Sequence, residues 1–128
     1  MWPVPVLPHV LKSYDLADLV DDIASANPPA YLRRCFAEGV SAPRLSWPRV
    51  QELAACALVL DAVVEGRDDA GLEPELLADW RAHYGGEFAK LKGLAAQALA
   101  RAAGPEGPPA DAEMLAELQQ LRGRLAGP

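Results

Sequence analysis

Apolar residues return along most of this chain at the three-to-four-residue spacing of an α-helix, and they predict a series of helices joined by polar breaks. Between residues 14 and 26 this spacing places one apolar stripe along one side of a helix, as amphipathic helices require. Similar stripes predict helices over residues 29–39, 74–84 and 87–103. The intervening stretches contain proline, glycine and small polar residues, which favour turns.

A further helix, over residues 50–65, is apolar on every face in its middle. Residues 53–60 read LAACALVL, and a helix that is apolar all round is buried on most sides. Ser46 before this helix is a suitable N-cap and Gly66 after it a suitable stop. We therefore predict an all-α fold, in which about five helices over residues 13–103 form a compact bundle around this buried central helix.

Local capping signals set the expected ends of the surrounding helices. Ser13 precedes the first helix and is a natural N-cap for it. Gly39 follows the apolar stripe of the second helix, at the position where glycine commonly terminates helices. Gly85 and Gly86 interrupt the helix that begins near Pro74, and they are expected to end it or bend it.

The first twelve residues predict an extended, proline-rich arm. Prolines in this stretch fix the backbone and remove hydrogen-bond donors, so a regular helix or a central strand is not expected. In an extended chain alternate side chains share one side, which groups Trp2, Val4 and Val6 into an apolar stripe. This stripe either packs on its own domain or binds a partner, and we assign these three residues to a partner surface.

A second arm is predicted at the other end of the chain. Residues 104–110, GPEGPPA, read as a linker, and residues 111–128 then form a helix capped by Asp111. Its apolar positions alternate spacings of four and three, the pattern of a short coiled-coil seam; they are Met114, Leu118, Leu121 and Leu125. A helix this short is marginal alone, so it must dock either on its own bundle or on another chain. We assign the seam to a partner surface, with docking on the chain's own bundle as the alternative.

The charge balance excludes several kinds of partner. With 18 acidic and 12 basic residues the net charge is −6 and the pI about 4.8. Nucleic-acid binding requires a basic surface that displaces counterions, so no direct contact with DNA or RNA is expected. The apolar run over residues 53–60 is too short to span a bilayer, and the start lacks the basic region of a secretory signal. We expect a cytoplasmic protein without membrane contact, or a virion protein assembled in the cytoplasm.

The first helix carries a strongly acidic polar face. Asp15, Asp18, Asp21 and Asp22 lie outside its apolar stripe, and residues 13–26 contain no basic residue. Acids near the start of a helix suit its positive end, but the later ones gain little from it. The face is either simply solvated or a docking surface for a basic partner. On the second interpretation Asp18 and Asp22 are partner-binding residues.

No arrangement of reactive side chains in this sequence is typical of an active site. His83 and Asp79 are four residues apart on one predicted helix, but a zinc site needs further ligands at short spacing. Cys35 and Cys56 lie among apolar helical residues, which is typical of small core side chains in a reducing compartment. We therefore expect no enzyme activity, no bound metal and no cofactor.

Together these features predict a non-enzymatic protein-interaction or assembly subunit, whose partners are other protein chains or copies of itself. In plan and size, as a short helical bundle with arms at both ends, the chain resembles the adaptor and head-completion proteins of tailed bacteriophages. That resemblance implies ring assembly within a virion and assigns no residues. The other hypotheses are a small acidic regulatory binder, such as an antitoxin, chaperone or inhibitor, and an enzyme with an unrecognised helical active site.

Overall fold

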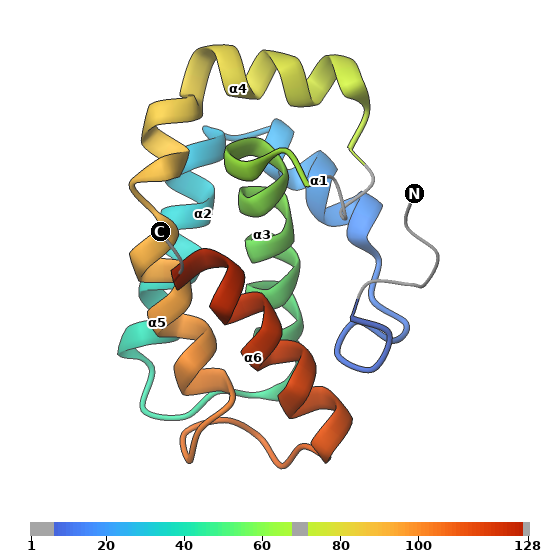
Figure 1. Cartoon of the computed structure of the whole chain (residues 1–128), viewed down its shortest axis with the longest axis vertical. Helices are drawn as coiled ribbons and strands as arrows, with labels where there is room; N and C mark the ends of the chain where they lie inside the picture. Colours follow the sequence, from blue (N-terminus) through green and yellow to red (C-terminus); the bar gives the residue numbers. More distant parts are fainter. Residues whose placement is uncertain (1–6, 68–71, 127–128) are drawn as a thin grey trace.

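Six α-helices and no strand make up the described part of the chain, which in this computed structural model is residues 7–67 and 72–126. The helices are α1 (Leu16–Ala24), α2 (Pro28–Ser41), α3 (Trp47–Glu65), α4 (Pro74–Ala89), α5 (Lys92–Ala102) and α6 (Ala112–Ala126) (Figure 1). The predicted all-α fold is confirmed. Trp2, Val4 and Val6, which the sequence assigns to a partner surface, lie outside the described residues.

The central helix is α3, as its apolar sequence predicts. Every residue from 53 to 63 is buried, and α3 packs against α2, α4, α5 and α6. The side chain of Ser46 accepts a hydrogen bond from the backbone N–H of Arg49, and Gly66 ends the helix in the left-handed conformation, with φ of 77°. Both ends of α3 therefore carry the capping residues expected from the sequence.

The other helices surround α3 on different sides. Figure 1 shows α4 lying across one end of α3, while α5 and α6 run antiparallel to each other along its length. Helix α2 packs against α3 and α5, and α1 lies at the edge of the bundle, chiefly on α2. This arrangement leaves the outer face of α1 directed away from the core.

Helix α6 packs on its own bundle. Leu118, Leu121 and Leu125 are only 1–2% exposed and belong to the same core cluster as α3 and α5, with Met114 half-buried beside it. The assignment of these seam residues to a partner surface is therefore corrected: they fill the core of their own chain. The seam pattern alone does not distinguish the two destinations, since an apolar stripe is satisfied by either.

The connection between α5 and α6 is held in place rather than acting as a free tether. The backbone N–H of Gly107 donates to the carbonyl of Gly104 at 3.0 Å, and the N–H of Leu45 donates to the carbonyl of Glu106 at 2.8 Å. The second bond joins the α5–α6 connection to the loop before α3. The predicted linker thus folds α6 back onto α5, which explains why α6 docks in its own chain.

Residues 7–13 form a compact turn, so the prediction of an extended arm over residues 1–12 is wrong for the part of it that the structure describes. The N–H of Leu11 donates to the carbonyl of Leu7 at 2.9 Å, and the N–H of Tyr14 donates to the carbonyl of Leu11 at 3.0 Å. Val10 is fully buried and Leu7 nearly so. Burial of these two apolar side chains favours a closed turn over an extended chain.

The predicted helix end at Gly39 is wrong, and Gly85 and Gly86 do not end their helix. Helix α2 continues to Ser41, and Gly39 is buried inside it at the crossing with α3 and α5. A Cβ atom at Gly39 would lie 2.8 Å from a methyl carbon of Leu53 and 3.2 Å from the Cβ of Ala98, so glycine here allows close helix contact. Gly85 and Gly86 lie within α4, and the break before α5 falls at residues 90–91.

Two arginines bind the last carbonyls of helices other than their own. Arg81 of α4 donates to the carbonyls of Ala62 and Val63 near the end of α3, at 3.2 and 3.1 Å. Arg101 of α5 donates to the carbonyls of Gly39 and Val40 near the end of α2, at 2.8 and 2.6 Å. Cations are favourable at helix C-termini because the exposed carbonyls there carry partial negative charge.

Candidate functional site

The outer face of α1 presents its aspartates to solvent. Asp15 caps the helix, accepting from the backbone N–H of Asp18 at 3.0 Å, so the cap lies two residues later than the predicted Ser13. Asp15, Asp18, Asp21 and Asp22 are all exposed. Among the described residues, none forms an ion pair with the carboxylates of Asp18, Asp21 or Asp22. The predicted acidic face therefore exists, and no described side chain neutralises its charge.

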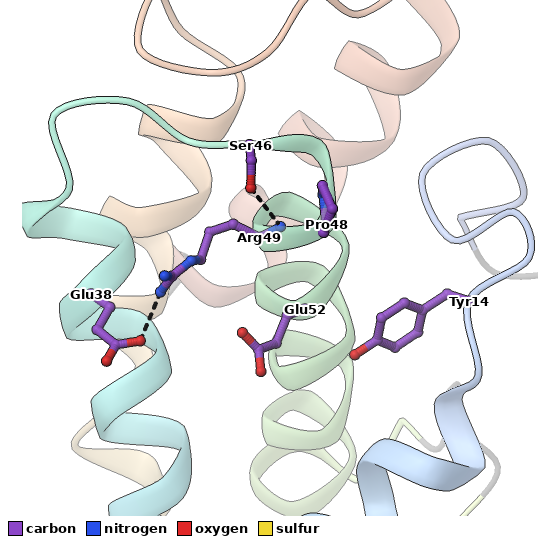
Figure 2. Close-up of a pocket in the computed structure, with 6 residues that line it drawn as sticks. All are labelled: Tyr14, Glu38, Ser46, Pro48, Arg49 and Glu52. Atoms are coloured by element: carbon purple, nitrogen blue, oxygen red, sulfur yellow. Dashed lines mark hydrogen bonds and ion pairs between the residues drawn. The ribbon is translucent and has the colours of Figure 1, made fainter.

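A recess of about 440 Å³ lies near this face. Its lining comes from three parts of the chain: the segment before α1, helix α2 and the first turns of α3 (Figure 2). The lining residues are Tyr14, Glu38, Ser46, Pro48, Arg49 and Glu52. We call this the Tyr14–Glu52 recess. Sequence reasoning did not identify it, because these residues meet only when the three elements pack together.

The charged groups of the recess are unequally paired. Arg49 donates to Glu38 at 2.7 Å, and its backbone N–H is the donor to the Ser46 cap at 3.4 Å. Figure 2 shows Glu52 between this ion pair and the ring of Tyr14. Glu52 is a half-buried residue, and among the described residues its carboxylate has no hydrogen-bond or ion-pair partner. The recess therefore contains one carboxylate whose charge is left uncompensated.

The pKa values of two tyrosines near the recess, Tyr14 and Tyr31, are raised. Burial raises the pKa of Tyr14, and the charge of Glu52 adds to the shift. Burial also raises the pKa of Tyr31 to about 12, with further contributions from Glu52 and Asp22. Both phenols stay neutral at physiological pH. The charges of Asp22 on α1 and of Glu52 in the recess therefore both act on Tyr31.

A guanidinium already lies on one of these rings. The Cζ atom of Arg34 is 5.4 Å from the ring centroid of Tyr31, within the range of cation–π attraction. We call the surface formed by Asp18, Asp22, Tyr31, Tyr14 and Glu52 the acidic–aromatic face. Of these residues, Asp18 and Asp22 were predicted from the sequence, whereas the tyrosines and Glu52 were not.

The two cysteines meet in the core between α2 and α3. Both are buried and free, and a hydrogen bond to Cys35 together with burial raises the pKa of the Cys56 thiol well above its ordinary value. A raised pKa keeps the thiol protonated and slow to react. Their positions agree with the predicted role as small core side chains.

A buried carboxylate that sequence reasoning missed lies on α3. Asp61 is fully buried, and Arg67 contacts it with two bonds, Nε to Oδ2 at 3.0 Å and an Nη to Oδ1 at 2.7 Å. Arg124 of α6 approaches the same carboxylate at 3.6 Å. The cluster joins the C-terminal parts of α3 and α6. A single acid directly after an apolar run was the available signal, since such an acid requires a buried counter-charge.

Glu117 of α6 fastens the N-terminal turn to the bundle. Its carboxylate accepts from the backbone N–H of Val10 at 2.9 Å and from that of His9 at 3.2 Å, and it contacts the Nδ1 atom of His9 at 2.6 Å. The amide of Gln51 on α3 donates to the carbonyls of Val10 and Lys12. These bonds satisfy the polar backbone of the turn. Val10 and Glu117 are 107 positions apart in the chain, so local sequence patterns could not predict their contact.

The contact between His9 and Glu117 predicts a pH-dependent stability. The hydrogen bond to Glu117 raises the pKa of His9 above its ordinary value of 6.5, and nearby Glu113 and Asp111 add to the shift. A raised folded-state pKa stabilises the fold below 6.5, and this contribution is lost as the pH rises through the raised value. Urea midpoints measured between about pH 5 and about pH 8 should therefore decline less steeply with rising pH in His9→Gln than in the wild type.

The matched control for this measurement is His83→Gln. His83 is an exposed histidine on α4 whose Nδ1 atom lies 3.1 Å from Asp79 on the same helix, so its loss does not release the N-terminal turn. The control should keep the wild-type pH profile. Equal profiles for His9→Gln and the wild type would show that the His9–Glu117 contact does not stabilise the fold.

Asp79 and His83 thus contact each other as their spacing predicted, but no third described ligand joins them. Within the described ranges, no group of three or more histidine, cysteine or acidic side chains is arranged to hold a metal ion. Across the same residues, no helix combines the length and apolar character needed to cross a bilayer.

Comparison of the chain with family models, curated proteins and solved structures gives no match. Function is therefore inferred from the geometry of the chain's own surface.

Proposed function

We propose that this chain is a non-enzymatic protein-interaction module whose acidic–aromatic face binds a basic segment of another protein. The observation that carries the proposal is the uncompensated charge of α1. Asp18 and Asp22 are exposed, and no described side chain pairs with their carboxylates. They lie four residues apart, where like charges destabilise a helix by about 0.2–0.5 kcal/mol. A basic partner would remove this repulsion.

The position of α1 supports the same interpretation. The helix is anchored by Leu19 and Ile23, which are buried, and it packs chiefly on α2. Its acidic side is therefore presented at the edge of the bundle, where the charge of Asp22 acts on Tyr31. Tyrosine is enriched in protein interfaces because its ring gives a large apolar contact and its hydroxyl a polar one. Charge at such a surface also accelerates association with an oppositely charged partner.

Assembly from copies of this chain, as in a ring-forming virion adaptor, remains the alternative. In an assembly the two arms were expected to supply the contacts, one of them through the heptad seam of the last helix. Since Leu118, Leu121 and Leu125 are buried in their own core, the seam no longer supplies that contact. The acidic face is also poorly suited to self-association, because copies of it repel each other. We therefore favour a different, basic chain as the partner.

The test compares proteins captured from cells of the source organism by the wild type and by two double variants. Asp18→Asn with Asp22→Asn removes two charges from α1. Glu75→Gln with Glu87→Gln removes two charges from exposed positions on α4 and serves as the matched control. Proteins that carry a basic segment should bind the wild type and the α4 variant but not the α1 variant. Capture of the same proteins by all three chains would contradict the proposal.

A further inference from the structure

The Tyr14–Glu52 recess contains polar groups that no described residue satisfies. The hydroxyl of Tyr14 and the carboxylate of Glu52 form no hydrogen bond with the described part of the chain, although both residues are half-buried. Half-buried polar groups that line a cavity are normally satisfied by water or by a ligand. In Figure 2 both groups border the same recess. They are therefore available to a single incoming group.

The charge of the recess selects a cation. Its lining has two carboxylates, Glu38 and Glu52, and one guanidinium, that of Arg49. The ion pair at 2.7 Å between Arg49 and Glu38 compensates two of these charges, which leaves that of Glu52. An anionic ligand would meet this potential unfavourably, whereas a cation would restore neutrality.

The face itself shows which cation suits it. Arg49 forms a short ion pair with a glutamate on this surface, and the guanidinium of Arg34 lies over a tyrosine ring. A guanidinium makes both contacts at once, since its planar fork binds a carboxylate while its face stacks on an aromatic ring. Glu52 and Tyr14 present the same two kinds of group without a partner. The ring of Pro48 adds an apolar wall against which the methylenes of a long side chain can pack.

We propose that the Tyr14–Glu52 recess binds one arginine side chain of the partner's basic segment, with the carboxylate of Glu52 as its counter-ion and the ring of Tyr14 as its stacking surface. This inference rests on the proposed function, because it names the residue through which the basic segment is recognised. The exposed aspartates of α1 then attract the segment, and the recess fixes its register. The volume of about 440 Å³ is within the range of ligand pockets.

The test uses the full chain and three probes in titration calorimetry. The first probe is a lysine-rich peptide with one central arginine. The second replaces that arginine with citrulline, which has nearly the same shape but no charge. The third is free arginine amide. The wild type should bind the arginine peptide more tightly than the citrulline peptide, by about 10-fold, as expected for a hydrogen-bonded charge pair.

Two variants separate the inference from the function beneath it. Glu52→Gln should abolish the preference for arginine over citrulline, while Glu87→Gln on α4, which removes the same charge elsewhere, should keep it. Asp18→Asn with Asp22→Asn should weaken both peptides equally. Circular dichroism establishes that each variant is folded.

Each result has a definite meaning. If Glu52→Gln keeps the arginine preference, or if the wild type shows none, the recess is not the arginine site, although the α1 variant can still uphold the proposed function. If Glu52→Gln loses the preference while the α1 variant binds like the wild type, the recess stands and the role of α1 fails. If free arginine amide binds as tightly as the peptide, the site serves a small guanidinium compound and a protein partner is overturned. Failure of the arginine peptide to bind overturns both proposals.

Discussion

Replacing Arg67 with alanine is expected to lower the free energy of unfolding by about 3 kcal/mol, because it leaves a buried carboxylate without its main counter-charge. Asp61 is fully buried, and Arg67 donates two bonds to it. Arg124 would remain at 3.6 Å from the carboxylate. For this reason we expect a loss at the lower end of the range found when buried ion pairs are broken.

Replacing Asp61 itself with leucine should lower the free energy of unfolding by less than Arg67→Ala does. The side chains of Arg67 and Arg124 are 44% and 20% exposed, whereas that of Asp61 is not exposed at all. After Asp61→Leu both arginines can therefore be hydrated, and the leucine adds apolar contact within α3. Urea unfolding of both single variants measures the difference. A loss below about 1 kcal/mol for Arg67→Ala, or a larger loss for Asp61→Leu, would contradict the view that the buried carboxylate dominates.

The second large effect is expected at Leu121 of α6. Leu121→Ala should lower the free energy of unfolding by about 2–5 kcal/mol, the range of large-to-small core substitutions. Leu60→Ala in α3 should cost a similar amount, because both side chains are almost completely buried. If the last helix served only to bind a partner, as the sequence suggested, Leu121→Ala would hardly change the stability of the monomer. Its burial in the chain's own core reverses that expectation.

Leu115→Ala is the matched control on the same helix. Leu115 is half-exposed, so its truncation should cost less than about 1 kcal/mol, since little apolar area is removed from contact. Urea unfolding of Leu121→Ala and Leu115→Ala, each against the wild type, separates the two faces of α6. Equal losses at the two positions would mean that α6 is not part of the core in solution.

Several features that depend on neighbouring residues in the sequence were predictable, although α1 is capped by Asp15 and not by the predicted Ser13. The all-apolar run of α3, its cap at Ser46 and its stop at Gly66 were all expected and are present. Asp111 also caps the last helix as predicted, accepting from the N–H of Met114 at 3.0 Å. Each of these depends on contacts within one or two turns, for which residue type is decisive.

Features that depend on packing were not predictable in the same way. Glycine is common just after a helix, so Gly39 was expected to end α2. It lies inside α2 instead, where the lack of a side chain allows close contact with Leu53 and Ala98. The seam of α6 fits its own core as well as a partner. The recess draws Tyr14, Glu38 and Glu52 from three elements, and no spacing in the sequence brings them together. Only the acidic character of the surface, at Asp18 and Asp22, was evident beforehand.

The arginines that bind the helix ends affect how the molecule opens. The last turn of a helix ordinarily frays readily, since its carbonyls lack partners within the helix. Near the end of α3 those carbonyls accept from Arg81 of α4, and near the end of α2 they accept from Arg101 of α5. Neither end can fray without also releasing a side chain of another helix. We therefore expect the end of α3 to open together with α4, and the end of α2 together with α5, rather than each end alone.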